Sequence, residues 1–149
     1  MVATLTGQPD HAERLDRSAR ELARAATVCR EAARLLETRP AAEVVNALAG
    51  IHERDLGHFH RLAKRLGLDA PTATRAHDAL DELDRARRRA GDAGVLAVVR
   101  EVEVTGTRAY ERLRDDPALP GEVRTSARSA LDELHRRWRR LEDAARVAD

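Results

Sequence analysis

Hydrophobic residues recur every three or four positions along most of the chain, which is the spacing of amphipathic helices. The clearest case runs from Ala41 to Leu66, where the apolar residues fill one arc of roughly 120–140° on a helical wheel. Two polar residues, His52 and Asp55, fall near the middle of that arc, where they would form either a satisfied core pair or the remnant of a metal site. The apolar residues are Val44, Val45, Leu48, Ile51, Leu56, Phe59, Leu62, Ala63 and Leu66.

The same spacing predicts further helices over 10–39, 74–89, 92–114 and 122–147. Residues 1–9 are expected to be a flexible lead-in, because Pro9 and Asp10 are typical of a helix start. Pro40 is expected to end the first helix, since the residue before a proline is excluded from the helical region. Gly67 is expected to cap the second helix.

Four long helices with short turns inside each half predict one all-α domain over 10–147. The order is a hairpin, a helical crossover over 67–93 and a second hairpin. Gly91 and Gly94 mark a break at the end of the crossover. A four-helix bundle with one long connection is the ferritin-like arrangement, so the expected fold is a ferritin-like four-helix bundle.

Composition narrows the class of protein. The chain has 149 residues, of which 42% are hydrophobic and 36% charged, which suits one globular domain. No apolar run approaches the roughly 18–20 residues that a membrane span requires. The start of the chain lacks the pattern of a signal peptide, and there is one cysteine, so a cytoplasmic location is expected. That cysteine, Cys29, lies on a predicted core seam and is expected to be a buried, inert thiol.

The second half resembles a bacterial family of uncharacterised ferritin-like four-helix-bundle proteins, a domain of unknown function. The similarity is carried by Val95-Leu96, Glu103, Ala109-Tyr110-Glu111, Leu119-Pro120 and Glu122-Val123-Arg124, and by Lys64-Arg65-Leu66-Gly67 at the end of the second helix. It extends over about Asp10 to Asp143. The resemblance implies the fold but no biochemical activity.

Ferritin-like dimetal sites combine inward-facing Glu residues with carboxylate-x-x-His pairs. Two such strings occur, from Asp55 to His58 and from Asp132 to His135. On the wheel His58 lies at the edge of the apolar arc, while Asp132 and His135 face solvent. The complete dimetal set is therefore not expected, because helix four offers no ligand over 127–131.

A reduced metal site is the alternative. Its candidate ligands are Glu21, His52, Asp55 and Glu103, and the candidate metals are iron and manganese. The same inward positions also suit a hydrogen-bonded core network of His52, Asp55, Tyr110 and Glu103 without metal, since buried polar groups require partners. Sequence leaves both interpretations open, with the network favoured.

The function predicted from these features is a non-catalytic helical scaffold or interaction protein that associates as a homodimer or with partner helices. A metal-binding or oxidative-stress protein is the first alternative. Binding of nucleic acid or an anionic surface through the arginines of 85–89 and 136–140 is the second. It is disfavoured because 27 basic and 26 acidic residues are interleaved along the chain.

Overall fold

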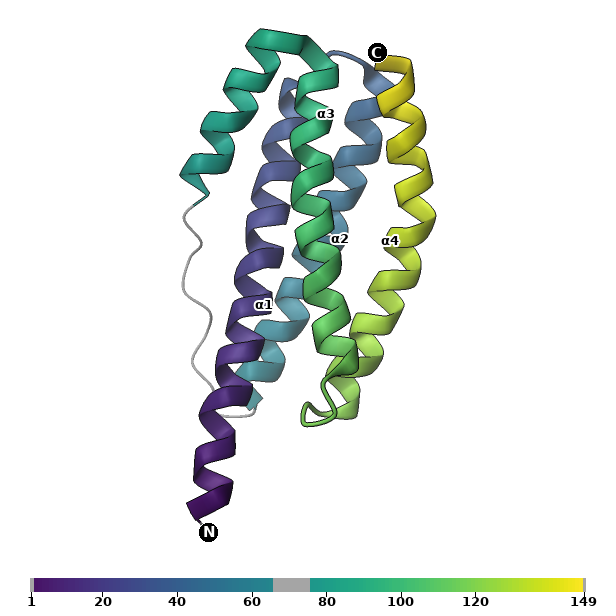
Figure 1. Ribbon diagram of the computed structural model, residues 1–149. Helices are drawn as coiled ribbons and strands as arrows, with labels where there is room; N and C mark the ends of the chain where they lie inside the picture. Colours follow the sequence, from purple (N-terminus) through teal and green to yellow (C-terminus); the bar gives the residue numbers. More distant parts are fainter. Residues whose placement is uncertain (1, 66–75, 149) are drawn as a thin grey trace.

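The computed structural model describes residues 2–65 and 76–148 and contains four helices (Figure 1). They are α1 (Val2–Leu35), α2 (Arg39–Arg65), α3 (His77–Asp115) and α4 (Gly121–Ala148). No strand occurs within these described residues. The predicted all-α four-helix bundle is therefore confirmed.

The helices are arranged as two antiparallel hairpins that pack side by side. α1 packs against α2 and α3, and α4 packs against the same two helices, so α1 and α4 lie diagonally opposite. In Figure 1, α1 and α4 run upward, whereas α2 and the long second part of α3 run downward. The part of the expected crossover at 67–75 lies outside the described residues, as does the cap expected at Gly67.

Two predicted helix boundaries are wrong. α1 begins at Val2, so the expected lead-in over 1–9 is helical from its second residue. α1 continues through Pro9, whose fixed φ is compatible with a helix although its ring removes one backbone hydrogen bond and crowds the preceding turn. α1 also ends at Leu35, and Pro40 lies in the first turn of α2 rather than ending α1. A proline suits a first turn because the N–H that it lacks would have no partner there.

α3 consists of two arms that meet at Gly91, as the two glycines in the sequence predicted. Gly91 has φ 60° and ψ −140°, a backbone conformation that side chains other than hydrogen strongly disfavour. The arms then come so close that a Cβ on Gly94 would lie 2.2 Å from the carbonyl oxygen of Ala86. The first arm, from His77, can therefore reverse tightly into the second arm, which forms the bundle.

Asp92 joins this bend to the turn between α1 and α2. Its carboxylate accepts hydrogen bonds from the backbone N–H of Glu37 at 3.0 Å, from that of Thr38 at 2.9 Å and from the Thr38 hydroxyl. Burial raises the pKa of Asp92, but these hydrogen bonds outweigh it and hold the pKa below its ordinary value. One side chain thus links three helix ends.

The core consists of leucine, valine and alanine contributed by all four helices. Its largest fully buried apolar side chains include Phe59, Leu22, Leu48, Leu96 and Leu141. Trp138 is only partly buried at its edge. None of the described helices is long and apolar enough to cross a bilayer. Within this apolar interior the polar residues of the next section are conspicuous exceptions.

Candidate functional site

Four polar side chains lie in the middle of the bundle among apolar neighbours. His52 on α2 is fully buried, Glu103 on α3 is 1% exposed, and Tyr110 is fully buried about two turns further along α3. Asp55, one turn after His52, is 7% exposed. Helical spacing places each pair on one face, as the wheel predicted for His52 and Asp55.

Hydrogen bonds join these residues into one chain. His52 Nε2 lies 2.7 Å from Glu103 Oε1, and His52 Nδ1 lies 3.2 Å from the hydroxyl oxygen of Tyr110. The Tyr110 hydroxyl donates to Asp55 Oδ2 at 2.7 Å. The predicted core network of these four residues is therefore confirmed. One detail differs, because Tyr110 lies between His52 and Asp55 and bridges two groups that were expected to pair directly.

The donors in this chain follow from counting protons. Tyr110 has a single hydroxyl proton, and it is used toward Asp55. His52 Nδ1 must therefore carry a proton and donate it to the Tyr110 oxygen. The other imidazole nitrogen, Nε2, shares a proton with Glu103 Oε1. Tyr110 thus fixes Nδ1 of His52 as the nitrogen that donates to its hydroxyl oxygen, which leaves Nε2 toward Glu103.

Cys29 on α1 joins the hydrogen-bonded network at its Glu103 end. Its thiol donates to Glu103 Oε1 over 3.2 Å, and its side chain is fully buried. Burial and the nearby Glu103 carboxylate raise the pKa of Cys29 well above its ordinary value. Burial and Asp55 likewise raise the pKa of Tyr110. Both groups therefore keep their protons near neutral pH, which agrees with the expectation of an inert thiol.

The network contains one of the three buried side-chain atoms that lack a hydrogen-bond partner within the described residues; the other two are Nε atoms of Arg124 and Arg137. Glu103 Oε2 is buried and has no hydrogen-bond partner among the described residues. Its sister oxygen Oε1 has two partners, the Cys29 thiol and the His52 ring. A buried acceptor without a partner costs roughly 1–3 kcal/mol, so this oxygen marks a place where something could bind.

Asp55 connects the buried chain to the surface. It lines a cleft of about 520 Å³ between α2 and α4, together with His58 and Ser126. Arg54 lies over it, 3.5 Å from Asp55 Oδ1 and 2.9 Å from Glu133 on α4. His58, predicted to lie at the edge of the apolar face, is half-buried and 3.0 Å from the Ser126 hydroxyl. The outer end of the network is therefore capped by an ion pair.

Glu21 is not part of the network, although the sequence analysis grouped it with His52, Asp55 and Glu103 as a metal ligand. Its carboxylate pairs with Arg112 and lies 3.6 Å from Arg17, at the surface. The reason is its height along the bundle. Glu21 is 19 residues before Pro40, about 28 Å along α1, whereas His52 is 12 residues after it, about 18 Å along α2.

Cys29, which the sequence analysis left outside the site, could also have been placed in it from its height along the bundle. Cys29 is 11 residues before Pro40. At 1.5 Å per residue it lies about 16 Å from that end of the bundle, close to the level of His52. It also lies on the core seam of α1, so both its height along the bundle and its inward direction could be read from the sequence.

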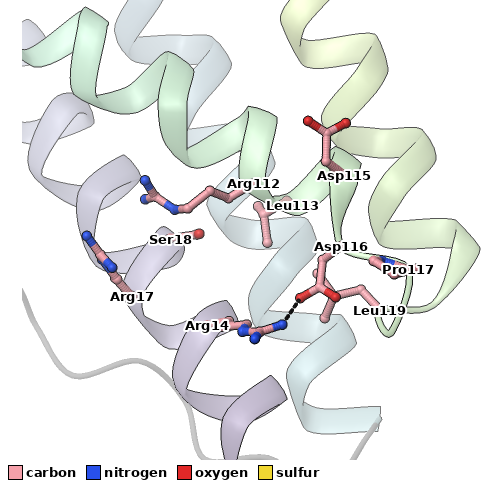
Figure 2. A pocket seen from close by; sticks show the side chains of 9 residues that line it. All are labelled: Arg14, Arg17, Ser18, Arg112, Leu113, Asp115, Asp116, Pro117 and Leu119. Carbon is pink, nitrogen blue, oxygen red and sulfur yellow. Dashed lines mark hydrogen bonds and ion pairs between the residues drawn. The ribbon is translucent and has the colours of Figure 1, made fainter.

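A second cavity, of about 400 Å³, lies at the end of the bundle where α3 meets α4 (Figure 2). Three arginines line it, Arg14, Arg17 and Arg112. Arg14 reaches Asp116 at 3.3 Å, and the other two pair with Glu21. Each positive charge at this cavity already has a negative partner, which disfavours it as a site for a polyanion.

Arginines in the two clusters of the sequence, 85–89 and 136–140, also pair with carboxylates. Arg85 pairs with Glu82 and Arg88 with Asp84 along the first arm of α3. On α4, Arg137 lies 3.8 Å from Glu133. The two pairs on α3 are exposed i,i+3 and i,i+4 pairs of a solvated helix face, whereas the i,i+4 pair on α4 is half-buried. On the same helix, Asp132 and His135 are exposed, as the wheel predicted.

Fold and site together define an all-α four-helix-bundle protein with a buried chain of hydrogen bonds across α1, α2 and α3. No protein-family model, curated protein or solved structure matches the chain. What the protein does must therefore be argued from this arrangement of residues.

Proposed function

We propose that this protein is a non-catalytic, ferritin-like helical bundle that serves as a scaffold for protein association. The ferritin-like assignment is supported by the order of the hairpins and by the first arm of α3 that precedes the second hairpin. The role as a scaffold is supported by how the core uses its polar groups.

The observation that carries the proposal is the closed hydrogen-bonded chain from Cys29 to Asp55. Its thiol and hydroxyl are buried and protonated, and its two ring nitrogens form hydrogen bonds with Glu103 and Tyr110. A chain of this kind across three helices favours one register over others, because a shifted helix would leave charged groups without partners. A uniquely packed bundle is what a scaffold requires.

We place the association surface at a groove between α3 and α4. The groove has a volume of about 260 Å³, and its apolar lining comes from Val104, Leu134 and Trp138. Val104 is 42% exposed, one of two large hydrophobic residues that are exposed within the described chain. The other, Val147, lies near the end of α4. Apolar side chains around a groove favour contact with another protein.

The partner we assign to this groove is a second copy of the chain. Arg108 and Glu111 also line the groove, one turn apart on α3. In a two-fold symmetric contact each residue of such a pair can face the opposite charge on the other copy. The apolar centre would be covered in the same contact.

Sedimentation equilibrium with Val104→Arg tests the proposal. We expect the native protein to sediment at twice the chain mass of 16.5 kDa and Val104→Arg to sediment at that mass. Val147→Arg introduces the same side chain outside the groove and should leave the dimer intact. A native protein that is monomeric across a dilution series, or a dimer that Val104→Arg does not weaken, would contradict this assignment.

A further inference from the structure

Three side chains of types that commonly bind metal ions converge in the core from three helices. They are Cys29 of α1, His52 of α2 and Glu103 of α3, and their ligand atoms all lie within 4.8 Å of one another. This set differs from the one expected from the sequence, since it contains a sulfur and lacks Glu21 and Asp55. It is also unlike a dimetal carboxylate site, which requires ligands from all four helices.

An independent feature points to a missing ligand at the same place. Glu103 Oε2 is the unpartnered buried oxygen described above, on a residue that is 1% exposed. Native proteins leave few buried polar atoms unsatisfied, and an unoccupied ion site is one explanation for such an atom. A cation held by both oxygens of the Glu103 carboxylate would satisfy it.

The orientation of His52 also suits a metal ligand. Its Nδ1–H donates to Tyr110, which in turn donates to Asp55. Histidines that bind metals usually donate their second ring N–H to a polar group in this way, which fixes the ring and its tautomer. The nitrogen left to bind a cation is Nε2, and Nε2 is the atom that faces Glu103.

We propose that Cys29 Sγ, His52 Nε2 and the Glu103 carboxylate bind one divalent cation of the zinc class. A thiolate, an imidazole and a carboxylate are all zinc ligands, and the thiolate disfavours manganese and magnesium, which prefer oxygen. The hydrogen-bonded chain is then the metal-free form. The cation replaces the thiol proton and the proton that His52 shares with Glu103, and both protons are released to solvent.

The ligand atoms must separate slightly to admit the cation. His52 Nε2 and Glu103 Oε1 are 2.7 Å apart, whereas two ligands of a tetrahedral zinc ion lie about 3.3 Å apart. Gly106 provides room for this movement, because it faces the His52 ring without a side chain. A Cβ at this position would lie 3.9 Å from His52 Cε1. Binding therefore requires a ring shift of less than about 1 Å rather than a change of fold.

Cobalt(II) is the probe for the experiment, because it occupies zinc sites and its bond to a thiolate absorbs in the near ultraviolet. Metal-free native protein is titrated with Co²⁺, and Zn²⁺ is then added as a competitor. We expect the thiolate absorption to saturate at one equivalent and to disappear when Zn²⁺ is added. No such band, or a band that needs a large excess of Co²⁺, would overturn the proposal.

Variants assign the ligands. Cys29→Ser should abolish the band, and His52→Gln and Glu103→Gln should each weaken Co²⁺ binding by 100-fold or more. Asp55→Asn, which acts through Tyr110, should weaken it roughly 10–100-fold. His58→Gln changes a histidine outside the cluster and should leave binding unchanged. A band that survives both His52→Gln and Glu103→Gln would indicate adventitious binding to the thiol and would refute the site.

Circular dichroism of each variant shows whether it is folded, and the native titration tests the site even if a variant fails to fold. A negative titration would leave the scaffold proposal intact, since sedimentation of the metal-free protein tests that proposal separately. If the titration is positive and the protein is monomeric, the dimer proposal is refuted and the metal-site proposal is supported.

Discussion

Replacing His52 by leucine should be one of the most damaging single changes in this bundle. His52 is fully buried and bonded on both ring nitrogens. Leucine fills a similar volume but removes both bonds, so among the described residues Glu103 keeps one partner, the Cys29 thiol. Leaving a buried polar group without its partner typically costs about 1–3 kcal/mol, and we expect a loss of at least that size in the free energy of unfolding, because two hydrogen bonds are removed together.

The compensating change is at Glu103. His52→Leu/Glu103→Leu removes both buried polar groups together, and an apolar pair of similar volume is often neutral or stabilising. Tyr110 keeps its hydrogen bond to Asp55 in this double variant. We therefore expect the double variant to recover most of the loss, whereas His52→Leu/Asp55→Leu should not, because Asp55 is bonded through Tyr110 rather than to His52.

Urea denaturation followed by circular dichroism, in the presence of a chelator, measures these differences. His58→Leu is the matched control, since this half-buried histidine has one hydrogen bond, to Ser126, and should cost about 1 kcal/mol or less. A His52→Leu protein within about 0.5 kcal/mol of native would refute the reasoning. So would a double variant with Glu103→Leu that is no more stable than the single one.

Two further predictions concern the bend in α3. Gly91→Ala places a side chain at φ 60°, and Gly94→Ala places one 2.2 Å from a backbone oxygen, so each should destabilise by roughly 1–3 kcal/mol. Gly50→Ala, on an exposed helix face with nothing within 4 Å, should instead stabilise by up to about 1 kcal/mol, and thermal unfolding of all three compares them. Equal effects at Gly91 and Gly50 would contradict the strained bend. Asp92 has a pKa below its ordinary value of 3.8, so its carboxylate stabilises the fold fully above that value, and this contribution is lost as pH falls through the lowered pKa. Asp92→Asn should therefore be less stable than native at pH 7, and the difference should shrink on acidification to about pH 2. Asp81→Asn, at an exposed position, should show no such trend, and a stability difference for Asp92→Asn that is constant with pH would rule out the ionised hydrogen-bonded carboxylate.

Sequence by itself determined the helices and most of the core. The spacing of apolar residues located four long helices and the break at Gly91 and Gly94, because a helix repeats every 3.6 residues whatever it packs against. The same periodicity placed His52, Asp55, Glu103 and Tyr110 on inward faces. A buried network followed, since groups on those faces must find partners there.

Tertiary structure decided which of these groups meet. A helical wheel predicts that a side chain points inward. Which side chains then contact each other also depends on their height along the bundle and on how the neighbouring helices are offset. Tyr110 therefore bridges His52 and Asp55, Glu21 pairs with Arg112 at the surface, and Cys29 reaches Glu103 across 74 positions of sequence. Only the tertiary structure shows that the candidate metal ligands meet, because their convergence depends on the packing of three separate helices against one another.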